Sequence, residues 1–119
     1  VFQAGGKHAS ADISMVYGMN SLKELGFNSI PVKDVQKIFD LNNLERLTLV
    51  ICGLKDVSGV EKMENLKYLS LLYNGIEDQR PILKAKNIET VYLKGNPISP
   101  GVLNAFHKKL DNIKASRAK

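Results

Sequence analysis

The sequence contains one cysteine and no long apolar run. A single thiol, Cys52, cannot form an internal disulfide, which argues against a small secreted protein held together by disulfides. No apolar stretch approaches the roughly 18 residues that a membrane-spanning helix needs. We therefore expect no membrane span.

Residues that could support catalysis or bind a metal are few and scattered. His8, His107 and Cys52 lie far apart in the sequence and do not form a ligand cluster. The stretch that begins at Gly95 lacks the Lys and Ser/Thr of a phosphate-binding loop. We expect no enzymatic activity, no cofactor and no metal site.

Positive charge is concentrated at the C-terminal end. The net charge is +5, and residues 99–119 carry five basic groups against one acidic group. The remainder of the chain is close to neutral. A basic end of this kind is compatible with binding to a nucleic acid or an anionic surface.

The sequence repeats with a period of 22 residues. Four columns are apolar: Leu22, Leu44, Leu66 and Ile88; Leu25, Leu47, Leu69 and Val91; Phe27, Leu49, Leu71 and Leu93; and Val32, Leu54, Ile76 and Ile98. One column is acidic and comprises Asp12, Asp34, Asp56 and Asp78. Alternating leucines within each copy predict a short strand, and copies at a fixed step predict parallel stacking.

Residues 66 to 76 read L-x-x-L-x-L-x-x-N-x-I, which resembles the leucine-rich repeat signature. The 22-residue step is similar to that of the internalins and of the nuclear regulatory subunit of protein phosphatase one. The resemblance implies an α/β solenoid. This would be a short leucine-rich repeat stack with parallel strands on the concave face, short helices or turns on the convex face and a C-terminal capping helix.

The resemblance also bears on location. Extracellular leucine-rich repeat proteins of animals usually have disulfide-bonded end caps, which this chain cannot form. We therefore expect a cytoplasmic protein. The alternative is a bacterial surface or secreted protein of the internalin kind.

We divide the chain into three parts. Residues 1–11 form an unpatterned N-terminal tail, residues 12–98 form the repeats, and residues 99–119 form the capping helix and a basic tail. The repeats comprise a partial repeat at 12–21, predicted to lack its strand, and full repeats that start at residues 22, 44, 66 and 88. The helix should run from about 102 to 115, with apolar positions at Val102, Leu103, Phe106, Leu110 and Ile113.

Polar positions in the repeat suggest two structural roles. The asparagine of the signature, present as Asn74 and Asn96, should satisfy backbone groups of the inward turn. Cys52 and Ile30 occupy the same position in earlier repeats, so Cys52 should be buried, and backbone or water contacts should replace the asparagine at Ile30. The acidic column should cap short helical segments.

The concave face is the predicted site of function. Side chains from neighbouring strands would form an aromatic and aliphatic patch there, with two basic residues on the same columns. These residues are Arg46, Val50, Ile51, Tyr68, Leu72, Tyr73, Tyr92 and Lys94. A contiguous exposed apolar patch commonly marks a partner site. We expect the partner to be another protein or a peptide.

Two other functions are open at this point. The basic C-terminal helix, with Lys108, Lys109 and Lys114, could bind nucleic acid or an anionic surface, although the concave strands add no basic stripe. Alternatively, the stack could be a structural or assembly subunit. The sequence leaves the oligomeric state unassigned.

Overall fold

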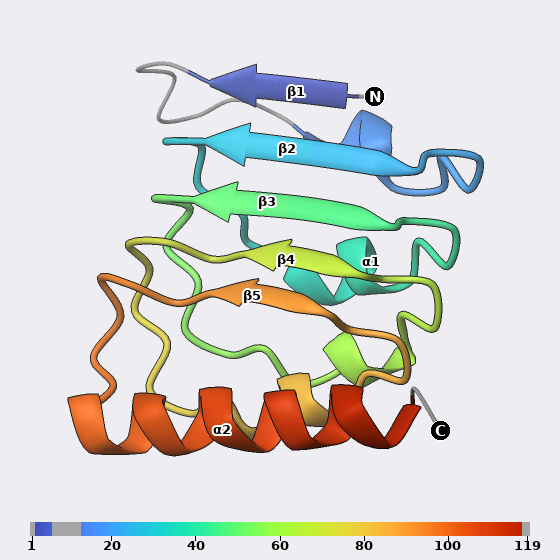
Figure 1. The fold of residues 1–119 in the computed structure, drawn as a ribbon. Helices are drawn as coiled ribbons and strands as arrows, with labels where there is room; N and C mark the ends of the chain where they lie inside the picture. Colours follow the sequence, from blue (N-terminus) through green and yellow to red (C-terminus); the bar gives the residue numbers. More distant parts are fainter. Residues whose placement is uncertain (1, 6–12, 118–119) are drawn as a thin grey trace.

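The computed structural model describes residues 2–5 and 13–117. Within these residues, five parallel strands form one sheet in chain order (Figure 1). They are β1 (Phe2–Gly5), β2 (Glu24–Asn28), β3 (Arg46–Val50), β4 (Tyr68–Ser70) and β5 (Thr90–Tyr92). Each strand therefore belongs to one turn of a solenoid, as the repeat predicted for β2 to β5.

The pairing register confirms the 22-residue period from β2 onward. Leu25 pairs with Leu47, Leu47 with Leu69, and Leu69 with Val91. The leucines of β3 and β4 have no exposed surface. Their fixed step stacks the inward side chains into one continuous core.

Strand β1 corrects the predicted N-terminal tail. Phe2 pairs with Leu25 and Ala4 with Phe27, so the first step is 23 residues rather than 22. The 22-residue columns place Gln3 in the apolar position, and the strand therefore escaped detection. Its repeat also contains Ile13 and Val16, which are buried as predicted, whereas Met19 is exposed.

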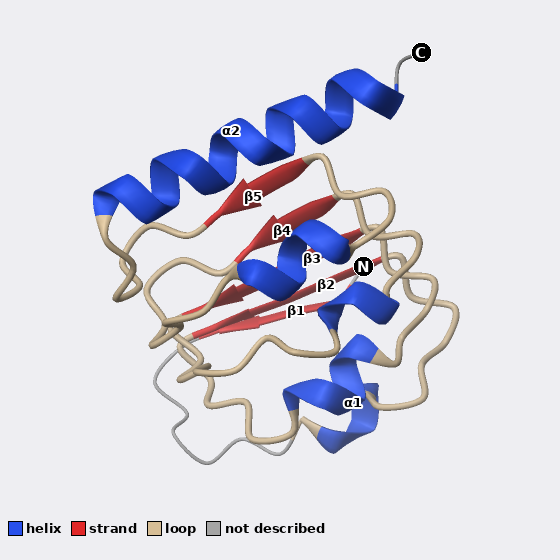
Figure 2. Ribbon diagram, turned by 90° about the horizontal axis from the view of Figure 1, so that it is seen from below, coloured by secondary structure: helices blue, strands red, loops and turns tan. Residues whose placement is uncertain are grey.

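The convex side is built from short segments (Figure 2). These are the 3-10 helix η1 (Ser14–Val16), the α-helix α1 (Val35–Phe39) and the 3-10 helices η2 (Val60–Lys62) and η3 (Arg80–Lys84). Gly59 precedes η2 with a positive φ of 99°, and Pro81 lies in the first turn of η3. Both residues favour turns over longer helices.

Helix α2 (Pro100–Arg117) closes the C-terminal end of the stack beside β5 and η3. Phe106 and Leu110 are buried, and Leu103 packs against the same core. Val102 is exposed, which corrects its predicted place on the apolar face. The guanidinium of Arg117 donates to the backbone carbonyls of Ile88 and Ala85, so the end of the helix is tied to the last repeats.

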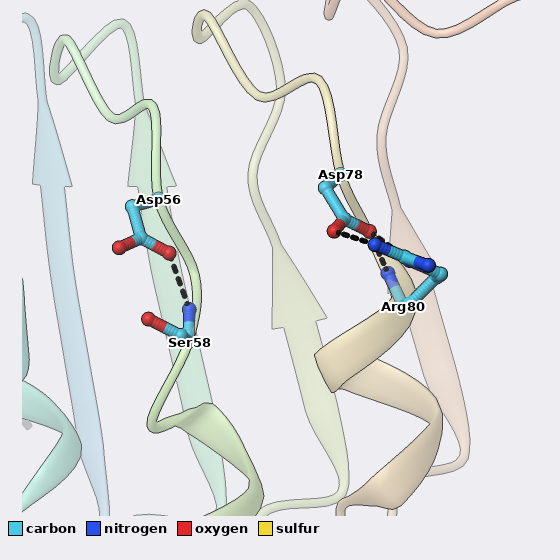
Figure 3. Close-up of polar contacts among 4 residues, drawn as sticks. All are labelled: Asp56, Ser58, Asp78 and Arg80. Carbon is cyan, nitrogen blue, oxygen red and sulfur yellow. Dashed lines mark hydrogen bonds and ion pairs between the residues drawn. The ribbon is translucent and has the colours of Figure 1, made fainter.

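The acidic column caps in a different way from that predicted (Figure 3). Asp56 accepts the Ser58 N–H at 2.9 Å and Asp78 accepts the Arg80 N–H at 3.0 Å, so each closes a turn two residues on. The side-chain hydrogen bonds from Arg80 hold the pKa of Asp78 down at about 2. Asp34 makes no such bond to α1, and that expectation was wrong. Asp12 lies outside the described residues.

Asn74 bridges two consecutive repeats, as its position predicted. Its Oδ1 accepts the N–H groups of Cys52 at 2.9 Å and Leu54 at 3.2 Å. Its Nδ2 lies within hydrogen-bonding distance of three carbonyls: Leu49 at 2.8 Å, Leu71 at 2.9 Å and Leu72 at 3.2 Å. One buried side chain therefore satisfies backbone groups of two turns.

The bridging weakens toward the N-terminus. Asn96 repeats the arrangement by accepting from Ile76 and donating to Leu71 and Leu93. The Cys52 thiol points at the carbonyls of Phe27 and Val50, at 3.5 and 3.4 Å, which a thiol bonds only weakly. The Val32 N–H, which an asparagine at position 52 would accept, donates instead to the Cys52 carbonyl at 3.0 Å. The backbone N–H groups that position 30 would serve lie outside the described residues, so the expectation for Ile30 stays a prediction.

A second asparagine column lies on the convex side of the strand starts. Asn43, Asn65 and Asn87 each donate from Nδ2 to a backbone carbonyl of the preceding repeat. These residues are also 22 apart, so the period could have revealed them. They are exposed, and their loss leaves groups that water can reach.

We predict that Asn74→Ala lowers the free energy of unfolding by about 2–4 kcal/mol, because buried N–H and C=O groups lose their partner. The matched variant Asn65→Ala should cost only about 0.5–1.5 kcal/mol, since water can replace its single bond. Urea denaturation of both variants measures the difference. Equal losses would show that Asn74 does not bridge the repeats.

We predict that Cys52 resists thiol reagents in the native protein. It is 1% exposed, and burial raises the pKa of its thiol from 9.0 to about 11, partly offset by a hydrogen bond from the Ile30 backbone. Labelling near neutral pH should be at least about 100-fold slower than in denaturant, because each unit by which the pKa rises lowers the fraction of thiolate about tenfold. Rapid native labelling would place Cys52 on the surface.

The same pKa shift sets a pH dependence. The unfolded thiol loses its proton first, so the contribution of Cys52 to stability is complete below pH 9.0 and declines between 9.0 and about 11. Cys52→Ser should remove this part of the decline in the free energy of unfolding at alkaline pH.

Candidate functional site

One face of the sheet is open. Within residues 2–5 and 13–117, the helical segments lie behind the sheet or at its end, and none covers the other side (Figure 1). Along β3, Leu47 and Leu49 point into the core, whereas Arg46 and Val50 alternate with them and point outward. The concave face therefore carries the side chains that the leucine columns leave free.

A cation and two aromatic rings meet at the centre of this face. The Arg46 guanidinium carbon lies 3.8 Å from the centre of the Tyr68 ring. The Tyr68 and Tyr92 rings are 5.6 Å apart and inclined at 62°, an edge-to-face contact. Cation–π and edge-to-face contacts of this kind restrict the side chains and preorganise them.

The end of each strand has an unusual backbone conformation. Ser29, Ile51 and Tyr73 have φ between 55° and 62°, and Gly95 in the same column has φ of 84°. Left-handed backbone costs a β-branched residue such as Ile51 about 1–2 kcal/mol. Hydrogen bonds across the strands hold it, including Ile51 N–H to Leu72 C=O and Tyr73 N–H to Lys94 C=O.

Two apolar side chains are exposed at these strained positions. Ile51 is 52% exposed and Tyr73 is 50% exposed. The Tyr73 ring lies directly over Gly95, where an added Cβ would approach a ring carbon to 2.2 Å. Gly95 therefore permits both the turn and the position of the ring.

Of the eight predicted site residues, four lie on the strands (Arg46, Val50, Tyr68 and Tyr92) and four follow the strand ends (Ile51, Leu72, Tyr73 and Lys94). Arg46, Ile51, Tyr73, Tyr92 and Lys94 are exposed. Val50, Tyr68 and Leu72 are half-buried among them. The first part of each strand holds the cation–aromatic cluster, and the last part holds the apolar rim with Lys94 as its cation.

A groove that the sequence did not reveal crosses the starts of the strands. Its volume is about 410 Å³, and Lys23, Glu24, Glu45, Arg46, Lys67, Tyr68, Glu89 and Thr90 line it. One of its columns alternates in charge, and Lys23 pairs with Glu45 at 3.3 Å across two repeats. The signal was present as opposite charges at 22-residue intervals.

The basic helix forms a separate surface. Lys108, Lys109 and Lys114 are exposed on α2, whereas Arg117 is engaged with the repeats. His107 packs its ring against Phe106, 5.2 Å away, as expected of a boundary residue. His8 lies outside the described residues.

The part of the chain that the structure describes lacks two features that would indicate other kinds of function. No helix there is both long and apolar enough to cross a membrane. No group of three or more His, Cys, Asp or Glu side chains there is arranged to hold a metal ion.

No protein-family model and no curated protein sequence matches the chain. Solved structures do match. An internalin (inlF) from Listeria monocytogenes is 26% identical with a TM-score of 0.73, over 82% of this chain and 29% of that one. A second Listeria monocytogenes internalin (inlC2) is 26% identical with a TM-score of 0.66, over 72% of this chain and 38% of that one.

A leucine-rich repeat protein from Leptospira interrogans is similar in fold, with 20% identity and a TM-score of 0.64 over 87% of this chain and 33% of that one. The chain thus spans less than two fifths of each of these structures. The likeness to the phosphatase regulatory subunit stays a prediction. The in-register 22-residue stack, its asparagine bridges and these neighbours together make the chain a leucine-rich repeat protein.

Proposed function

We propose that the chain is a protein-interaction module that binds another protein or a peptide on its concave face. The observation that carries this proposal is the exposure of Tyr92 on β5 and of Ile51 and Tyr73 in the segments that follow β3 and β4. Large apolar side chains gathered on an open face are typical of partner sites, and tyrosine is enriched at their centres. Solenoids commonly bind along such surfaces.

Backbone strain supports the same proposal. Glycine or asparagine would suit the left-handed position of Ile51 better, and half of the isoleucine side chain is exposed. Folding therefore gains little from an isoleucine at this position. A partner that covers Ile51 and Tyr73 would explain why an apolar residue stands at position 51.

The role that we propose is one of binding rather than catalysis. We keep the predicted cytoplasmic location, with a bacterial surface or secreted protein as the alternative. Because the similar structures are about two to three times as long, the concave face of this chain corresponds to a part of their stacks. A short peptide segment suits four or five strands at about 4.8 Å spacing better than a broad globular surface does.

We predict that Tyr73→Glu and Tyr92→Glu weaken partner binding by at least about 2 kcal/mol each, because a charge would replace a desolvated ring. The free energy of unfolding should change by no more than about 0.5 kcal/mol for Tyr73→Glu, as for other exposed positions. It should fall by up to about 1.5 kcal/mol for Tyr92→Glu, because the edge-to-face contact with Tyr68 is lost. A pull-down identifies the partner, and calorimetry then measures its affinity for each variant.

The control for this experiment is the triple variant Lys108→Gln, Lys109→Gln and Lys114→Gln. It should leave the affinity nearly unchanged and alter mainly its salt dependence. If the lysine variant abolishes binding while the tyrosine variants bind normally, α2 is the functional surface. If all variants bind normally, a structural role is favoured.

We also predict that Ile51→Asn separates stability from binding. Asparagine tolerates the left-handed backbone, so the free energy of unfolding should stay equal or rise by up to about 1 kcal/mol. Partner affinity should fall, because the exposed apolar contact is lost. A variant that loses stability and keeps full affinity would show that Ile51 serves the fold.

A further inference from the structure

Arg46 is the one residue of the strand-start groove whose charged group lies over an aromatic ring. Its neighbours in register are Glu24 on β2 and Tyr68 on β4. The guanidinium lies against Tyr68 at 3.8 Å, and among residues 2–5 and 13–117 it forms no ion pair with a carboxylate. Arg46 has therefore turned toward the ring and away from the adjacent Glu24.

This orientation leaves the donors of Arg46 available. A guanidinium has five N–H donors in its own plane, and stacking on a ring uses its face rather than its edge. Tyr92 supports the arrangement, because its ring contacts Tyr68 edge to face. The pair thus holds a planar fork that matches a carboxylate through two parallel hydrogen bonds.

The other cations of the groove differ from Arg46. Lys23 is paired with Glu45. Lys67 lies in the alternating column, between Glu45 and Glu89 in the neighbouring repeats, so its field is largely cancelled.

We propose that Arg46, positioned by Tyr68, binds a side-chain carboxylate of an acidic partner peptide, with apolar residues of the peptide against the rim of Ile51 and Tyr73. The proposal rests on the function proposed above and names the chemistry of its partner. The exposed rim cation Lys94 favours an acidic segment. The three carboxylates that line the groove disfavour a phosphate, which carries close to two charges.

The test uses two pools of synthetic peptides with acetylated and amidated ends, so that side chains carry the only carboxylates. Both pools contain leucine and phenylalanine at fixed positions. One pool has glutamate, and the other has glutamine, at the same intervening positions. The wild-type chain should bind the glutamate pool at least about tenfold more tightly, as expected for a bidentate charge-assisted pair.

Variants of the groove assign that preference to a residue. Arg46→Gln should abolish it, and Arg46→Lys should retain only part of it because lysine lacks the planar fork. Tyr68→Leu should reduce the preference while Arg46 is still present, since the guanidinium loses its support. Lys67→Gln is the matched control, and it should keep the preference within about twofold. Denaturation midpoints confirm that each variant is folded.

Equal binding of the two pools to the wild-type chain would overturn this inference, and so would the absence of binding to either pool. A preference that survives Arg46→Gln but is lost in Lys67→Gln would overturn it as well. The proposed function is decided separately by the Tyr73 and Tyr92 variants against the identified partner. A partner that needs those tyrosines but shows no preference for carboxylates would leave the binding module intact without an Arg46 anchor.

Discussion

The fold depends on how the chain turns inward after each strand without burying unpaired peptide groups. Asn74 solves this with one side chain, since its oxygen accepts two N–H groups and its nitrogen faces carbonyls of both repeats. With the turn satisfied, Leu69 and Leu71 can be completely buried. The strand is then short and parallel to its neighbours, so its alternate side chains are left on an open face. The hydrogen bonds of Asn74 in the turn thus make the open concave face possible.

The concave surface combines two kinds of restraint. At the strand starts, Arg46 and Tyr68 hold one another in place through contact of a cation with a ring. At the strand ends, left-handed backbone projects Ile51 and Tyr73 outward, and hydrogen bonds between strands hold that conformation. A partner would therefore meet side chains whose conformational freedom is already reduced, which lowers the entropic cost of binding. Neither restraint is needed to bury the leucine core.

The sequence predicted the parts of the fold that repeat with a constant step. The leucine columns, the bridge at Asn74 and the burial of Cys52 follow from side-chain chemistry at fixed intervals, and the structure confirms them. β1 was missed because its step to β2 is 23 residues, so the 22-residue columns place Gln3 and Gly5 where the register has Phe2 and Ala4. The eight site residues stay a prediction, and the contact of Arg46 with Tyr68 depends on side-chain rotamers. Residue types at a fixed spacing do not show whether the guanidinium of an arginine turns toward a neighbouring ring or a neighbouring carboxylate.

The most direct test of this account is native-state hydrogen exchange at the backbone amides that donate to the Asn74 side chain. The N–H groups of Cys52 and Leu54 should exchange only through global unfolding, because their acceptor is a buried oxygen shared by two repeats. The N–H of Gly53, an exposed residue between them, provides an internal reference. Slow exchange at 52 and 54 beside fast exchange at 53 is the predicted result. Exchange at all three at the rate of open loop amides would contradict the bridge and the solenoid that depends on it.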